Sequence, residues 1–130
     1  MDRLFLDADV LFSAAYRIDA RLLPLWKVRN VTPCSSHYAL QEARINLAGE
    51  DQWGRLTELS GSLQLFEAGQ APLPSGILLP EKDAPILLAA IEARATHLLT
   101  GDVRHFRVYF GKKIAGIAIT RPVEYLRERK

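Results

Sequence analysis

The sequence has little cysteine and no long apolar run. Cys34 is the one cysteine among 130 residues, so the chain cannot form an internal disulfide and suits a reducing compartment. The most apolar region, residues 77–91, is interrupted by PEKDAP and falls short of the roughly 20 apolar residues of a membrane span. Asp7 interrupts the first apolar run, which is not the pattern of a secretion signal. We therefore expect a cytoplasmic protein with no membrane segment.

Charge is nearly balanced over the whole chain but not along it. The net charge is +2, while residues 101–130 carry eight basic and three acidic side chains, a local excess of five positive charges. A basic end on a mildly acidic chain favours a polyanionic partner such as a nucleic acid. A solvated surface with a charged tail explains the same pattern, so charge alone leaves both interpretations open.

Short apolar segments alternate with helical ones along the chain. Asp9 suits the N-cap of the first helix, and Pro85 fits the first turn of a later one. The alternation, without repeats or an internal boundary, predicts a single α/β domain over residues 1–130 with a mostly parallel central sheet. Strands are predicted at 3–7, 31–34, 63–67, 96–102 and 116–120, and helices at 10–17, 20–30, 35–48, 51–62, 83–95 and 121–129.

Two carboxylates follow predicted strands, and a third opens a helix. Asp7 ends the first strand and Asp102 ends the strand HLLTG. In a parallel sheet the carboxyl ends of the strands meet at one edge, so both side chains should project from that edge. Asp83 stands at the start of the helix that precedes HLLTG. The three acids are therefore candidates for one crevice.

Glu42 is the fourth candidate. It lies in the middle of the predicted 35–48 helix, four residues after Tyr38 and three before Ile45. This spacing places the three residues on one helix face, which we expect to point inward.

Each acid has a simpler explanation when it is taken alone. Asp7 and Asp102 suit turns that follow strands, and Asp83 suits the positive end of a helix dipole. Glu42 can pair with a neighbouring arginine or reach solvent, and Asp9 is better explained as a cap than as a ligand. If the four candidates share one crevice, however, their mutual repulsion needs a counter-ion. Clustered carboxylates suit a hard cation, Mg²⁺ or Mn²⁺, which can activate a bound water.

Three segments in this order resemble the PIN (PilT N-terminus) nuclease domain. They are LFLDADVLFSA, SSHYALQEA and EKDAPILLAAIEARATHLLTGDVRHF, and the resemblance covers essentially the whole chain. The most specific part is the helix DAPILLAA followed by HLLTGD and then HF after two further residues. The resemblance implies a three-layer, Rossmann-like α/β/α fold and a metal-dependent ribonuclease.

Carried over by position, the resemblance implies roles for individual residues. Thr100, two residues before Asp102, would contact the acidic ligands rather than the metal. Asp9 matches a position that is often filled by a small polar residue. Some PIN domains have a further acid after the final Asp; here Arg104 and His105 occupy that stretch. Either could contact phosphate, while His105 also suits a surface or helix-capping position. The acidic metal ligands implied are Asp7, Glu42, Asp83 and Asp102.

Small PIN proteins resemble VapC-like toxins of toxin–antitoxin pairs. This implies an RNA substrate, a small antitoxin protein that silences the toxin, a homodimer, and products with a 5′-phosphate and a 3′-hydroxyl. Arg104, Lys112 and Lys113 are candidates for holding the RNA backbone, although ordinary surface charge explains them equally well.

Two alternatives remain at this stage. LFLDADVL with TGD also resembles haloacid-dehalogenase-type phosphatases, in which the first Asp is a nucleophile and the second an acid/base. Leu11 stands where that family has a hydroxyl residue, and no lysine is found at the expected place. The second alternative is a catalytically silent or conditional module that binds RNA or docks a partner.

Overall fold

One mostly parallel sheet organises the chain, and the computed structural model describes residues 1–129 of it. The sheet order is β3-β2-β1-β4-β6-β5, with every pairing parallel except that of β5 with β6. The strands are β1 (Asp2–Leu6), β2 (Val31–Ser36), β3 (Gln64–Phe66), β4 (His97–Leu99), β5 (Lys113–Ile114) and β6 (Ile117–Thr120).

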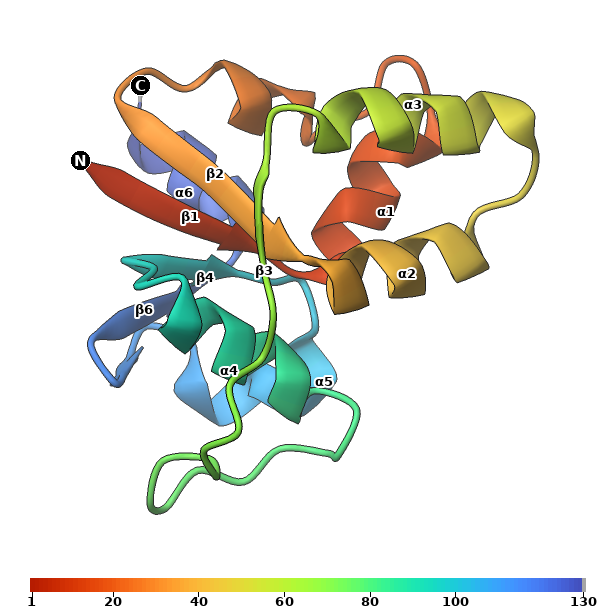
Figure 1. Cartoon of the computed structure of the whole chain (residues 1–130). Coiled ribbons are helices and arrows are strands. Elements are labelled where there is room, and N and C mark those ends of the chain that lie inside the picture. The colour runs from red at the N-terminus through yellow and green to blue at the C-terminus, as the bar shows by residue number, and fades with distance from the viewer. Residues whose placement is uncertain (130) are drawn as a thin grey trace.

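Helices cover both faces of this sheet and give the α/β/α arrangement predicted from the sequence. In Figure 1, α4 lies in front of the sheet and α6 behind it, while α1, α2 and α3 group beyond the tips of β1 and β2. The helices are α1 (Ala8–Tyr16), α2 (His37–Asn46), α3 (Glu50–Ser60), α4 (Ala84–Glu92), α5 (Val103–Phe106) and α6 (Pro122–Glu128), with 3₁₀ turns at Leu23–Lys27 and Arg107–Tyr109. No helix in the described part of the chain is long and apolar enough to cross a membrane.

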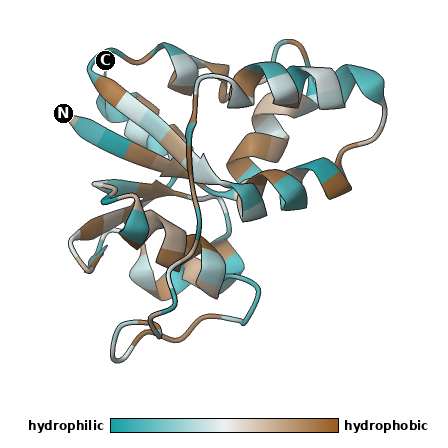
Figure 2. Ribbon diagram, in the orientation of Figure 1, coloured by the Kyte–Doolittle hydropathy of each residue, from teal (hydrophilic) through white to brown (hydrophobic). Residues whose placement is uncertain are grey.

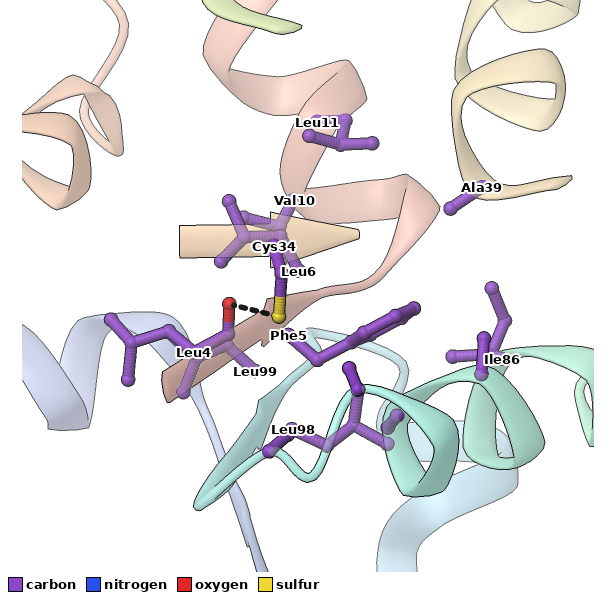
Figure 3. Close-up of a cluster of buried hydrophobic side chains, with 14 of the residues drawn as sticks. Leu4, Phe5, Leu6, Val10, Leu11, Cys34, Ala39, Ile86, Leu98 and Leu99 are labelled. Atoms are coloured by element: carbon purple, nitrogen blue, oxygen red, sulfur yellow. Dashed lines mark hydrogen bonds between the residues drawn. The ribbon is translucent and has the colours of Figure 1, made fainter. Parts of the chain in front are cut away.

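The core lies where the central strands meet α1 and α4. Hydrophobic residues dominate these elements, whereas α2 and α3 are mostly hydrophilic (Figure 2). Leu4 and Phe5 on β1 are fully buried, and the Cys34 thiol beside them donates to the Leu4 carbonyl oxygen at 3.4 Å (Figure 3). Burial raises the pKa of the Cys34 thiol to about 11, so this cysteine is a small core residue and not a nucleophile.

One local prediction differs from the structure, and two short elements were missed. Residues 20–30 form only the 3₁₀ turn at Leu23–Lys27, because Pro24 stands in its first turn and Asn30 adopts a positive φ of 60° soon after it. The short helix α5 and the edge strand β5 were not predicted. Both are too short to carry a hydrophobic period that sequence patterns can reveal.

The strand order places a topological switch point at β1. The chain runs from β1 through β2 to β3 on one side, and β4, β6 and β5 continue the sheet on the other. Ligands in open α/β sheets bind beyond the carboxyl ends of the strands at such a point. A ligand site is therefore expected at the loops after β1 and β4.

Candidate metal centre

An open cleft of about 490 Å³ lies beyond the carboxyl ends of β1 and β4. All four acidic residues expected to form the site line this cleft, although they come from four separate stretches of the chain. Lys82 is the one basic side chain among the described residues that line it. The lining residues are Asp7, Ala8, Asp9, Phe12, Tyr38, Glu42, Ala43, Asn46, Lys82, Asp83, Ile86 and Asp102.

Asp7 is held rigidly at the end of β1. Its side chain accepts hydrogen bonds from the Ala8 N–H at 2.6 Å and from the Thr100 hydroxyl at 2.8 Å. Asp7 is therefore the N-cap of α1, and the expectation that Asp9 caps this helix is wrong. The helix begins at Ala8, two residues earlier than the apolar pattern predicted, because β1 leads into it with only Asp7 between them.

Asp9 instead connects the first turn of α1 to the loop after β4. One carboxylate oxygen accepts the Gly101 N–H at 2.8 Å, while the other, Oδ1, is buried without a hydrogen-bond partner. A side chain at position 101 would bring its Cβ to 2.9 Å from the Asp9 carboxylate, so glycine permits this close approach. Asp9 thus fixes the loop that carries Thr100 and Asp102 against the start of α1.

Asp83, Asp102 and His105 form the tightest group in the cleft. The His105 Nδ1 atom lies 2.7 Å from an Asp83 oxygen and 2.8 Å from an Asp102 oxygen. The Asp102 side chain also accepts the backbone N–H of His105 at 3.1 Å, and this hydrogen bond caps the start of α5. Asp83 precedes α4 but makes no capping hydrogen bond to it, so its carboxylate is available to the cleft. Sequence reasoning gave His105 no place among the metal ligands.

Glu42 reaches the cleft from α2 and lies beside Tyr38, whose hydroxyl donates to the Lys82 carbonyl oxygen at 2.8 Å. The prediction that Ile45 shares an inward face is wrong, because Ile45 is 66% exposed. The small side chains of Ala39 and Ala43 are the buried residues of α2, which packs against α1. Glu42 therefore lies at the edge of the inward face and not at its centre.

The electrostatics of the cleft disfavour ionised carboxylates. Burial raises the pKa of Asp7 to about 7, and the neighbouring Asp9 charge adds to this. Burial also raises the pKa of Asp9, to about 6, against the lowering effect of the Gly101 N–H. The pKa of Asp83 is raised by burial, although the nearby His105 acts in the opposite direction. These carboxylates therefore lack sufficient positive charge from the described residues around them.

The donors suit a divalent cation. Asp83 Oδ2 is buried and has no partner in hydrogen-bond geometry. Asp9 Oδ1 is likewise buried without a hydrogen-bond partner. Asp83, Asp102 and His105 each offer a ligand atom, and these atoms lie within 4.8 Å of one another. Carboxylate oxygens are the ligands that Mg²⁺ and Mn²⁺ prefer, so the residues present fit such an ion.

The basic residues expected to hold RNA do not line the cleft. Arg104 is exposed on α5, two residues after Asp102. Lys112 and Lys113 are exposed at the edge strand β5, which β6 and β4 separate from β1. Lys82, which the sequence did not single out, is the basic residue at the cleft itself. The sequence could have indicated Lys82, because Lys82 directly precedes Asp83.

No protein-family model and no curated protein matches the chain. Solved structures of similar fold include the following two. The first is VapBC2 from Rickettsia felis bound to a DNA fragment from its promoter, with a TM-score of 0.60 and 13% identity over 92% of this chain and 98% of that one. The second is FitAB bound to an IR36 DNA fragment, with a TM-score of 0.55 and 17% identity over 92% of this chain and 94% of that one. The likeness is one of fold, shared with components of toxin–antitoxin complexes.

Proposed function

We propose that this chain is a metal-dependent endoribonuclease of the PIN type and the toxin of a toxin–antitoxin pair. The observation that carries the proposal is the convergence of Asp7, Asp83 and Asp102 in one cleft at the switch point of the sheet, with a buried Asp83 oxygen that has no hydrogen-bond partner. Such a cluster needs a divalent cation to be stable in its ionised form. The fold shared with VapBC2 and FitAB components supports the family.

In this proposal each side chain has a distinct task. Asp83 and Asp102 bind Mg²⁺ or Mn²⁺, and Asp7 completes the set while Thr100 and the Ala8 N–H fix its orientation. When bound, the cation supplies a water nucleophile and stabilises charge on the phosphate in the transition state. Glu42, half-buried on α2, orients the attacking water through its carboxylate.

Substrate binding falls to basic residues around an acidic cleft. Lys82 lines the cleft and is the first candidate for a phosphate contact, and exposed Arg104 on α5 extends from the same loop as Asp102. Lys112 and Lys113 remain candidates for contacts with RNA outside the cleft. Because RNA is a polyanion, such contacts supply much of the affinity and make it depend on salt.

The toxin assignment rests on the cleft together with the fold. A chain with converging carboxylates suits the RNA-cleaving partner of such a pair, with a small antitoxin protein as its inhibitor. The proposal treats residues 1–130 as one domain that acts in the cytoplasm as a homodimer. The phosphatase alternative is less well supported, because Leu11, where that chemistry needs a hydroxyl, is fully buried in the core.

The test is RNA cleavage by the purified protein with Mn²⁺, with Mg²⁺ and with EDTA, beside Asp7→Asn. Asparagine keeps one oxygen to accept the Ala8 N–H and presents an NH₂ donor to the Thr100 hydroxyl, which can turn to accept it. The variant loses the charge but should fold, so it should lose cleavage. Asp19→Asn is the matched control, because the Asp19 side chain is 80% exposed outside the cleft. Equal cleavage by Asp7→Asn and the wild type would place the activity elsewhere. Absence of cleavage with every metal would favour the RNA-binding or partner-docking alternative.

A further inference from the structure

His105 occupies a position that a surface or capping residue would not require. Its Nδ1 atom lies 2.7 Å from Asp83 and 2.8 Å from Asp102, yet it makes a geometrically acceptable hydrogen bond to neither. A ring N–H that served only as a donor would point at one of the two oxygens. Here the nitrogen and both oxygens lie side by side, as ligands around a common centre do.

The spacing of these atoms is compatible with the same interpretation. Adjacent ligands of an octahedral cation with bonds of about 2.1 Å lie about 3 Å apart. The separations of 2.7 Å and 2.8 Å from Nδ1 to the two oxygens are slightly shorter than that value and are also typical of an imidazole–carboxylate ion pair. The missing hydrogen-bond geometry at Nδ1 is what favours a metal. Asp83, which is 7% exposed, contributes a buried oxygen that lacks a hydrogen-bond partner. An ion at this position would satisfy Asp83 Oδ2 and His105 Nδ1 together.

We propose that His105 is a direct nitrogen ligand of the metal, together with Asp83 and Asp102, and that the site therefore prefers Mn²⁺ to Mg²⁺. This inference rests on the proposed function for the presence of a divalent cation. Imidazole suits transition metals, whereas Mg²⁺ favours oxygen ligands and keeps its waters. One nitrogen among oxygen ligands thus shifts selectivity without excluding Mg²⁺.

The decisive measurement is pulsed electron paramagnetic resonance of the protein loaded with Mn²⁺ alone. A coordinated imidazole gives a nitrogen coupling to the Mn²⁺ electron spin, and oxygen ligands do not. The chain has three histidines, so each source can be tested by substitution. We expect the coupling in the wild type and in His37→Gln, because the His37 side chain is 65% exposed. We expect its loss in His105→Gln.

Selectivity provides a second measurement. His105→Gln should weaken Mn²⁺ binding about tenfold and Mg²⁺ binding much less, as measured by calorimetric titration. His105→Asp replaces the nitrogen with oxygen, so it should retain cation binding, lose the nitrogen coupling and lose the preference for Mn²⁺. Circular dichroism of each variant establishes that it has folded.

Several outcomes would overturn the inference. They are Mn²⁺ bound to the wild type without nitrogen coupling, coupling that persists in His105→Gln, and no Mn²⁺ binding at all. The proposed function fails separately. Nitrogen coupling without RNA cleavage would support His105 as a ligand and contradict the nuclease. RNA cleavage without nitrogen coupling would support the nuclease and contradict His105 as a ligand.

Discussion

The two ends of strand β1 each carry an aspartate, and the protein treats them in opposite ways. Asp2, at the start, accepts a hydrogen bond from the Tyr125 hydroxyl at 2.7 Å and pairs with Arg129. The Tyr125 hydrogen bond is the main reason that the pKa of Asp2 is lowered. Asp7, just past the other end, is buried among further acids, and its pKa is raised to about 7. One carboxylate is balanced within the chain, and the other calls for a charge from outside it.

This contrast separates structural from functional acids. A stabilising residue is expected to have its partners in the folded chain, as Asp2 does. A group that the fold leaves poorly solvated and next to like charges lowers stability, so its presence in a cleft favours a functional role. The surroundings of Asp2 and Asp7, at the two ends of β1, therefore distinguish the expected roles of the two aspartates.

The largest expected difference between the two ends is in catalysis. Asp83→Asn removes one of the proposed metal ligands, so it should lower RNA cleavage at least about 100-fold in Mn²⁺. Asp2→Asn should leave the cleavage rate within about twofold, because Asp2 lies at the opposite end of the sheet. Single-turnover cleavage of a short RNA measures both. Comparable losses in the two variants would remove the distinction.

The next difference is in the dependence of stability on pH. Below about pH 4, Asp7 is protonated in both the unfolded and the folded chain. As pH rises from 4 to 7 the unfolded chain releases this proton and the folded chain retains it, so the free energy of unfolding should fall by a few kcal/mol. Asp7→Asn should flatten this fall and stabilise the protein at pH 8. Urea unfolding at pH 5 and pH 8, both in EDTA, provides the measurement.

Asp2 should show the opposite sign. Its lowered pKa means that its contribution is present above pH 4 and lost as pH falls below it. A wild-type stability in EDTA that rises steadily from pH 4 to pH 8 would contradict the assignment for Asp7.

A divalent cation should reduce the contrast. At about 100 times its dissociation constant, Mn²⁺ should stabilise the folded wild type by about 2.7 kcal/mol at pH 7.5. Asp83→Asn should show little of this gain, whereas Asp2→Asn should show all of it. Thermal unfolding with and without Mn²⁺ tests the expectation, and Mg²⁺ provides the comparison ion. Equal stabilisation of the wild type and Asp83→Asn would place the cation elsewhere.

The smallest effect concerns the balanced end alone. Tyr125→Phe removes the hydroxyl that donates to Asp2, so it should lower the free energy of unfolding by about 1 kcal/mol. The ring of Tyr125 is buried and remains in place, so cleavage should not change. Urea unfolding at pH 7 measures the loss. A change in cleavage rate in this variant would show that the two ends are coupled.

The sequence predicted the sheet edge well and its details less well. The positions of Asp7 and Asp102 after apolar strands were enough to place both at one edge, because parallel strands align their ends. The place of His105 could not be predicted, because it depends on a four-residue helix that Asp102 itself begins. The capping role passed from Asp9 to Asp7 because helix boundaries shift by a residue or two when tertiary contacts decide them.

Glu42 illustrates the remaining limit of periodicity. The spacing correctly grouped Glu42 with Tyr38, but α2 packs through two alanines and leaves Ile45 in solvent. A helix with few large apolar residues does not reveal which side it buries. The RNA substrate, the antitoxin, the homodimer and the single domain stay predictions.

The contact between Asp9 and Gly101 has a consequence for the evolution of this chain. The two positions lie 92 residues apart in sequence but in direct contact. Asp9 accepts the Gly101 N–H, and a Cβ at position 101 would force the Asp9 carboxylate to shift. In related chains we expect the pair to covary: glycine at position 101 wherever an acid stands at position 9, and larger residues at 101 only where position 9 has become small. The contact between positions 9 and 101 would then be inherited as one unit.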